Sequence, residues 1–101
     1  MNPRLFDEVI GILQEVKHVL EVPGTDVAWS RYKSVEEAVG DIHQHIERLR
    51  AGDVSKIDDL TLLFAPTGSL QEISISSGWG EAFLYLAARF DRVIEPLRRR
   101  Y

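Results

Sequence analysis

The chain has 101 residues, of which 45% are hydrophobic and 28% are charged, and it contains no cysteine. This balance is typical of one compact globular domain and excludes a disordered or low-complexity chain. The lack of thiols excludes disulfide scaffolds, zinc fingers, iron–sulfur clusters and cysteine nucleophiles. We therefore interpret residues 1–101 as a single domain.

The formal net charge of −4 is unevenly distributed along the chain. Five arginines and two acidic residues give +3 over residues 89–101, so the rest of the chain carries −7. An acidic body repels phosphate backbones, and we expect no nucleic-acid partner. The N-terminus has acidic residues within its first eight positions, and no apolar run is long enough to cross a bilayer. We therefore expect no signal peptide, no membrane contact and a cytoplasmic location.

The N-terminal segment is predicted to form a helix over residues 3–21. Asn2 followed by Pro3 is a typical helix start, because asparagine caps free N–H groups and proline suits the first helical position. One stripe of this helix collects the apolar residues Leu5, Val9, Ile12, Val16, Val19 and Leu20. The turn at residues 22–24 marks its end.

The clearest helix is predicted over residues 34–51. Ser34 and Glu37 have the spacing of a capping box. The apolar residues of its seam are Val35, Val39, Ile42, Ile46 and Leu49. Gly52 suits the left-handed conformation that often follows the end of a helix.

The middle of the chain is harder to interpret. Its first apolar residues keep helical spacing, which favours a short helix that ends at residues 65–68. A capping-box pattern at residues 69–72 also favours a helical turn, whereas Ile73 and Ile75 alternate with polar residues as in a strand. A short irregular segment or a β-hairpin near residues 60–76 is therefore the alternative.

A last helix is predicted to begin after Ser77 as its N-cap. Its apolar face consists of Phe83, Leu86, Ala87, Phe90, Ile94 and Leu97. Pro96 lacks a backbone N–H, so we expect the helix to end or kink near Glu95 and residues 98–101 to fray. The predicted fold class is all-α, a compact bundle of about four helices that bury their apolar stripes against one another.

His43 and His45 are the first candidates for metal-binding or acid–base chemistry. On a helix their side chains diverge by about 200°, so they do not share one ion. Glu37, Asp41 and His45 follow one flank at i, i+4 spacing, and Asp41 is placed to orient the imidazole. We expect surface ion pairs here, and a metal-dependent or acid–base enzyme is the alternative. No cofactor and no bound metal are expected, because no phosphate loop, metal motif or serine-nucleophile motif occurs.

Three aromatic residues, Trp29, Tyr32 and Trp79, lie in the predicted connections between helices. Aromatic side chains in loops either close the open ends of a bundle or form a binding hot spot. We favour the first interpretation, because a short bundle has open ends to close.

Tyr85, Arg89 and Arg92 share the outward face of the last predicted helix. An exposed tyrosine beside arginines is typical of an interface anchor. Together with the lack of catalytic motifs, this predicts a small soluble interaction or regulatory protein, such as an adaptor, a regulator or a toxin-neutralising partner. Its protein partner is unknown, and a homodimer is the simplest version.

Overall fold

The computed structural model describes residues 3–28, 30–66 and 68–100, and within these ranges it contains five helices and no strand. The helices are α1 (Pro3–Leu20), α2 (Val35–Arg50), α3 (Ile57–Leu63), α4 (Ser69–Ser77) and α5 (Gly80–Arg100). The prediction of an all-α fold is confirmed. The bundle of about four helices is broadly as expected. Between α2 and α5, where one short helix was predicted, the structure has two, α3 and α4.

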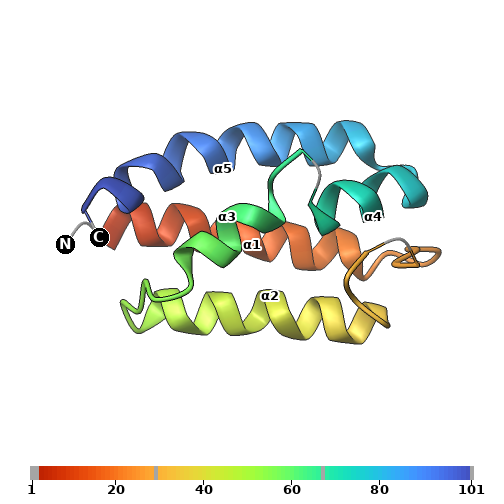
Figure 1. Ribbon diagram of the computed structural model, residues 1–101, viewed down its shortest axis with the longest axis horizontal. Coiled ribbons are helices and arrows are strands. Elements are labelled where there is room, and N and C mark those ends of the chain that lie inside the picture. The colour runs from red at the N-terminus through yellow and green to blue at the C-terminus, as the bar shows by residue number, and fades with distance from the viewer. Residues whose placement is uncertain (1–2, 29, 67, 101) are drawn as a thin grey trace.

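Three long helices, α1, α2 and α5, form the body of the bundle (Figure 1). Helix α1 packs against both α2 and α5, and it runs antiparallel to each of them. The chain between α2 and α5 forms α3 and α4, of which α4 packs against α5. Helix α1 begins and α5 ends at the same end of the molecule, whose long dimension is 39 Å.

The ends of α2 follow the sequence signals closely. The Ser34 hydroxyl accepts a hydrogen bond from the Glu37 N–H at 3.0 Å, so Ser34 is the N-cap. Gly52 has a φ of 73°, the left-handed conformation predicted for it. The start of α1 at Pro3 also agrees with the prediction, and Asn2, its predicted cap, lies outside the described residues.

The hairpin alternative near residues 60–76 is wrong, because α3 and α4 occupy this segment. The alternation that indicated a strand is a helical pattern, in which Ile73 is buried and Ile75 is exposed. Ser69 is also not the N-cap of α4, because Gly68 occupies that position. A Cβ on Gly68 would lie 2.5 Å from the carbonyl oxygen of Leu62, so only glycine allows the chain to pass α3 so closely.

Helix α5 differs from its prediction at both ends. Ser77 does not cap it: Ser77 is the last residue of α4, and its hydroxyl accepts the Asp26 N–H at 2.8 Å. Pro96 does not end it either, because α5 continues to Arg100. The lost hydrogen bond is offset by burial of Ile94 and Leu97 on either side of the proline.

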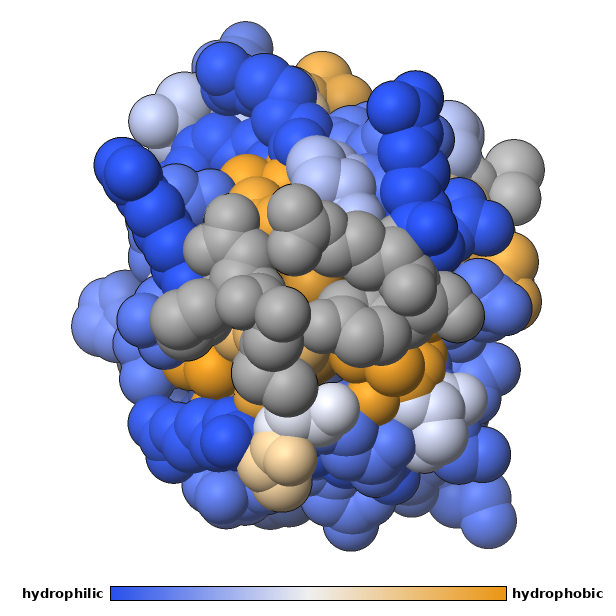
Figure 2. Space-filling model, turned by 90° about the vertical axis from the view of Figure 1, so that its left-hand side faces the viewer, coloured by the Kyte–Doolittle hydropathy of each residue, from blue (hydrophilic) through white to orange (hydrophobic). Residues whose placement is uncertain are grey.

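The core forms where the apolar stripes of the long helices meet. Phe90 of α5 is fully buried, and its ring stacks on Phe64 with centroids 3.9 Å apart. Phe64 directly follows α3 and also lies against Phe83, so α3 is anchored to α5 by aromatic packing. Figure 2 shows the end of the bundle where α1 begins, with apolar surface inside a rim of hydrophilic side chains. None of the described helices has the length and hydrophobicity needed to span a membrane.

Candidate functional site

Two groups of polar side chains combine acidic, basic and aromatic residues. The first, which we call the buried cluster, consists of Tyr32, Asp41 and His45. Helix α2 places Asp41 and His45 one turn apart, and the loop before α2 brings Tyr32 against them. The Tyr32 hydroxyl donates a hydrogen bond to Asp41 Oδ2 at 2.6 Å, and His45 Nε2 lies 4.0 Å from Asp41 Oδ1.

The burial of this cluster corrects one expectation. Surface ion pairs were predicted along this flank, yet Tyr32 and His45 are each only 5% exposed. The divergence of the two histidines is confirmed: His43 is exposed and lies 3.6 Å from Glu47. Helical geometry separates the two rings, and the packing of α2 within the fold buries His45 but not His43.

The surroundings of the buried cluster shift the pKa values of Tyr32 and His45. Burial raises the pKa of Tyr32, and the hydrogen bond to Asp41 raises it further, so the phenol remains a proton donor. Burial lowers the pKa of His45, while the negative charge of Asp41 opposes that shift. Arg31 and Arg48 also lower the pKa of His45, and Asp59 raises it. Burial therefore disfavours the charged form of His45, and the neighbouring Asp41 already accepts a hydrogen bond from Tyr32.

A surface pocket of about 380 Å³ opens beside the buried cluster. Its lining residues are Arg31, Tyr32, Glu37, Gly40, Asp41 and Gln44. Glu37 thus lies near Asp41, as its spacing predicted, but His45 is not part of the pocket wall. The ranges that the structure describes contain no group of three or more His, Asp or Glu residues able to hold a metal ion.

The aromatic residues predicted in the connections have different environments. Tyr32 is buried, in the position of a plug rather than of a binding surface. Trp79 is half-buried, and its Nε1 atom has no hydrogen-bond partner among the described residues. Trp29 lies outside the described residues. Tyr85, which was also predicted to belong to an interaction surface, is exposed: 64% of its surface is accessible to solvent.

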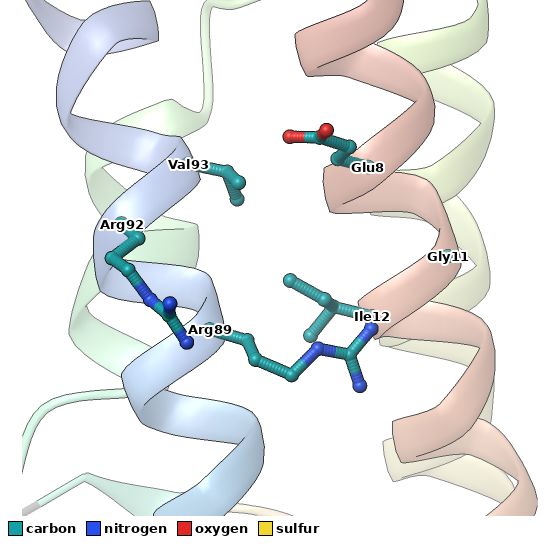
Figure 3. A pocket seen from close by; sticks show the side chains of 6 residues that line it. All are labelled: Glu8, Gly11, Ile12, Arg89, Arg92 and Val93. Carbon is teal, nitrogen blue, oxygen red and sulfur yellow. The ribbon is translucent and has the colours of Figure 1, made fainter.

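The second group surrounds a groove between α1 and α5. The residues that line this groove are Glu8, Gly11, Ile12, Arg89, Arg92 and Val93. We call this surface the α1–α5 face, and it consists of Glu8, Gly11 and Glu15 on α1 and Tyr85, Arg89 and Arg92 on α5. The groove has a volume of about 420 Å³, and Ile12 and Val93 contribute its apolar surface (Figure 3). In Figure 3, Glu8 and Arg92 lie on opposite sides of the groove.

The arginines of the α1–α5 face differ in their contacts. Arg89 Nη1 lies 2.7 Å from Glu15 Oε2, across the two helices. The Arg89 guanidinium also lies 5.4 Å from the centre of the Tyr85 ring, within the range of a cation–π contact. Arg92 is exposed and forms no ion pair with any residue of the described ranges. Arg89 is therefore held in place by two contacts, whereas Arg92 has no ion pair within the described ranges.

The sequence predicted the residues that α5 contributes to this face, but not those that α1 contributes. Tyr85, Arg89 and Arg92 lie together on α5, as their spacing predicted. Glu8 and Glu15 were not assigned to a site, although with Gly11 they follow the i, i+3, i+7 spacing of one helical stripe. That pattern shows a shared side of α1, but it does not show that this side borders α5.

Comparison with known proteins adds no relative to this description. No protein-family model matches the chain, and no curated protein or solved structure is significantly similar to it.

Proposed function

We propose that this protein is a non-enzymatic interaction module, an adaptor or a small regulator, that binds a protein partner through the α1–α5 face. The observation that carries the proposal is the exposed Arg92, which has no ion pair in the described ranges. Arg92 lines the groove together with Ile12 and Val93, and it lies one turn from Arg89. Arginine and tyrosine are enriched in interfaces, where they supply many of the energetically dominant contacts.

The charges of the face indicate the chemistry of the partner. A guanidinium forms paired hydrogen bonds with a carboxylate, so Arg92 favours an acidic side chain on the partner. Arg89 is already positioned by Glu15 and Tyr85, and it loses little further freedom on binding. The apolar part of the groove, Ile12 and Val93, offers area to bury beneath these polar contacts.

The acid–base alternative at Asp41 and His45 has weaker support. It rests on the pocket beside the buried cluster, which gives solvent access to Asp41. However, Asp41 already accepts a hydrogen bond from the Tyr32 hydroxyl, and His45 does not line the pocket. A general acid or base has to reach the group whose proton it transfers.

A site-specific photo-cross-linker tests the proposed function even though the partner is unidentified. The cross-linker replaces Tyr85 in one variant and Leu62 of α3 in the matched control, because both side chains are 64% exposed. We expect protein adducts in cells from the Tyr85 position and none of the same mass from the Leu62 position. Equal labelling at both positions, or no adduct at either, contradicts an interaction function for this face.

A further inference from the structure

We propose that Lys17 is an acylation site, which accepts a short acyl group from a thioester with His43 as the base. The site lies between the end of α1 and the start of α2, and it shares no residue with the α1–α5 face. It therefore goes beyond the proposed function. The proposal is carried by a chain of side-chain contacts, by the pocket beside them and by the charges of that pocket.

The first observation is a chain of contacts that joins α1 to α2. Lys17 Nζ lies 3.4 Å from His43 Nδ1, and His43 Nε2 lies 3.6 Å from Glu47 Oε1. Arg50 Nη1 lies 2.9 Å from the same Glu47 oxygen. A carboxylate beside Nε2 favours the tautomer that carries its proton there, which leaves Nδ1 as the acceptor. His43 is therefore placed to take a proton from the Lys17 nitrogen.

The order of amine, imidazole and carboxylate is the arrangement of an activated nucleophile. Helix packing brings it together, because α1 provides Lys17 and α2 provides His43 and Glu47 one turn apart. The two helices lie side by side and antiparallel (Figure 1).

The other two lysines of the chain, Lys33 and Lys56, have different surroundings. Both are exposed, whereas Lys17 is half-buried. Lys56 Nζ lies 3.9 Å from Asp59 Oδ2, and among the described residues neither lysine contacts a histidine. Access to solvent alone would therefore favour reaction at Lys33 and Lys56, and only the contact with His43 favours Lys17.

A surface pocket provides room for the acyl group. It has a volume of about 520 Å³, and both Lys17 and His43 line it. Val35 and Val39 of α2 contribute apolar surface to the same pocket. A short acyl chain removes this surface from water when it binds, which favours a donor with an apolar acyl group.

The acidic residues of the pocket indicate the class of acyl donor. Glu21 and Glu36 also line it. Their negative charges repel an acyl phosphate, whose phosphate group is an anion. The reacting end of a thioester is uncharged and meets no such repulsion. The pocket therefore favours a thioester as the donor.

The reaction moves the acyl group from sulfur to nitrogen. An ammonium has no lone pair, so Lys17 first releases one proton to solvent, and its nitrogen then attacks the thioester carbonyl to form a C–N bond. His43 Nδ1 takes a second proton from this nitrogen as the C–S bond breaks, and the leaving thiolate receives that proton from the imidazolium. The products are an amide on Lys17 and a free thiol, and the chain loses one positive charge.

Acylation of the purified chain by S-acetyl-N-acetylcysteamine, a neutral thioester, tests the proposal. Peptide mass spectrometry measures the rate at each of the three lysines in the same sample, so Lys33 and Lys56 are internal controls. We expect Lys17 to react at least about tenfold faster than either of them, the lower part of the range for a positioned base. Equal rates at the three lysines, or a slower rate at Lys17, overturn the proposal.

Two variants test the role of His43. His43→Ala is expected to reduce the rate at Lys17 to that of Lys33, and imidazole added in solution should restore part of it. His18→Ala is the matched control, because it removes an exposed histidine that neighbours Lys17 in sequence. Circular dichroism verifies that both variants fold. If His43→Ala leaves the rate at Lys17 unchanged, or if imidazole restores none of the loss, His43 is not the base.

Glu47 acts through His43 and is a positioning residue. Glu47→Gln is expected to reduce the rate at Lys17 by a smaller factor than His43→Ala, because the imidazole remains in place with less control of its tautomer. Added imidazole should not restore this loss, since the base is still present. A Glu47→Gln variant that reacts as slowly as His43→Ala and is rescued by imidazole contradicts this role.

A change of donor tests the pocket itself. We expect the preference for Lys17 over Lys33 to increase when a butyryl thioester replaces the acetyl thioester, because the longer chain reaches the valines. Acetyl phosphate is expected to show a smaller preference for Lys17 than either thioester. An equal or greater preference with acetyl phosphate overturns the assignment of the donor, and a preference that falls with the butyryl chain overturns the role of the pocket.

Discussion

The buried cluster and the α1–α5 face are built from similar residues and behave in opposite ways. Each brings a tyrosine against charged or ionisable side chains: Tyr32 against Asp41, and Tyr85 against Arg89. In the cluster, Tyr32 is enclosed and its hydrogen bond is made within the chain. On the face, Tyr85 is exposed and a neighbouring arginine has no ion-pair partner in the described ranges. Similar side chains therefore make their contacts within the chain where they are buried, and at the exposed face we propose that they bind a partner.

The largest expected difference between the two regions comes from removing each tyrosine. Tyr32→Ala leaves a cavity beneath the loop and is expected to lower the free energy of unfolding by about 3–5 kcal/mol. Tyr85→Ala removes an exposed side chain and is expected to change it by less than about 0.5 kcal/mol. Urea denaturation monitored by circular dichroism measures both values. If both variants lose a similar amount of free energy of unfolding, Tyr85 also supports the fold, and the two tyrosines do not differ in role.

A smaller effect is expected when only the hydrogen bond of the buried cluster is lost. Tyr32→Phe retains the ring but removes the donor to Asp41, and we expect a loss of about 1–2 kcal/mol. Asp41→Asn weakens the same hydrogen bond, because it replaces the charged acceptor by a neutral amide. The combined variant should lose less than the sum of the two single losses, because both remove one interaction. Strictly additive losses would mean that the 2.6 Å contact contributes nothing to stability.

The pH dependence of stability tests the burial of His45. Burial lowers the pKa of folded His45 below its ordinary value of 6.5, so the unfolded chain binds a proton more readily than the folded one. The contribution of His45 to stability is therefore complete above pH 6.5 and is lost as the pH falls through the lowered pKa of the folded state. We expect His45→Gln to reduce this dependence in urea titrations at several pH values. His43→Gln on the exposed side of α2, measured in the same way, controls for the replacement of a histidine on this helix.

The smallest effects on folding are expected at the arginines of the α1–α5 face. Arg92→Ala is expected to change the free energy of unfolding of the monomer by less than about 0.5 kcal/mol. Arg89→Ala breaks the pair with Glu15 and is expected to cost less than about 1 kcal/mol, with a smaller loss at high salt. Denaturation at protein concentrations that favour the monomer measures these values. A loss of several kcal/mol at Arg92 would assign it to the fold rather than to recognition.

Local patterns were sufficient to predict the three long helices and the outward position of Tyr85. Helix α2 follows its prediction almost residue by residue, because its cap and its apolar seam are set by neighbours along the chain. The same reasoning failed at α4, where Ile73 and Ile75 alternate as in a strand, and at Pro96, through which α5 continues. In both places, burial against other helices outweighs the local signal.

The spacing of the amino acids determined which side chains share a helical stripe, since helical periodicity depends only on positions along the chain. The tertiary structure decided which stripes are covered. It buried His45 in the packed fold, and it placed Glu8 across a groove from Arg92. Both results depend on contacts between segments that are distant in sequence, and no local pattern encodes those contacts.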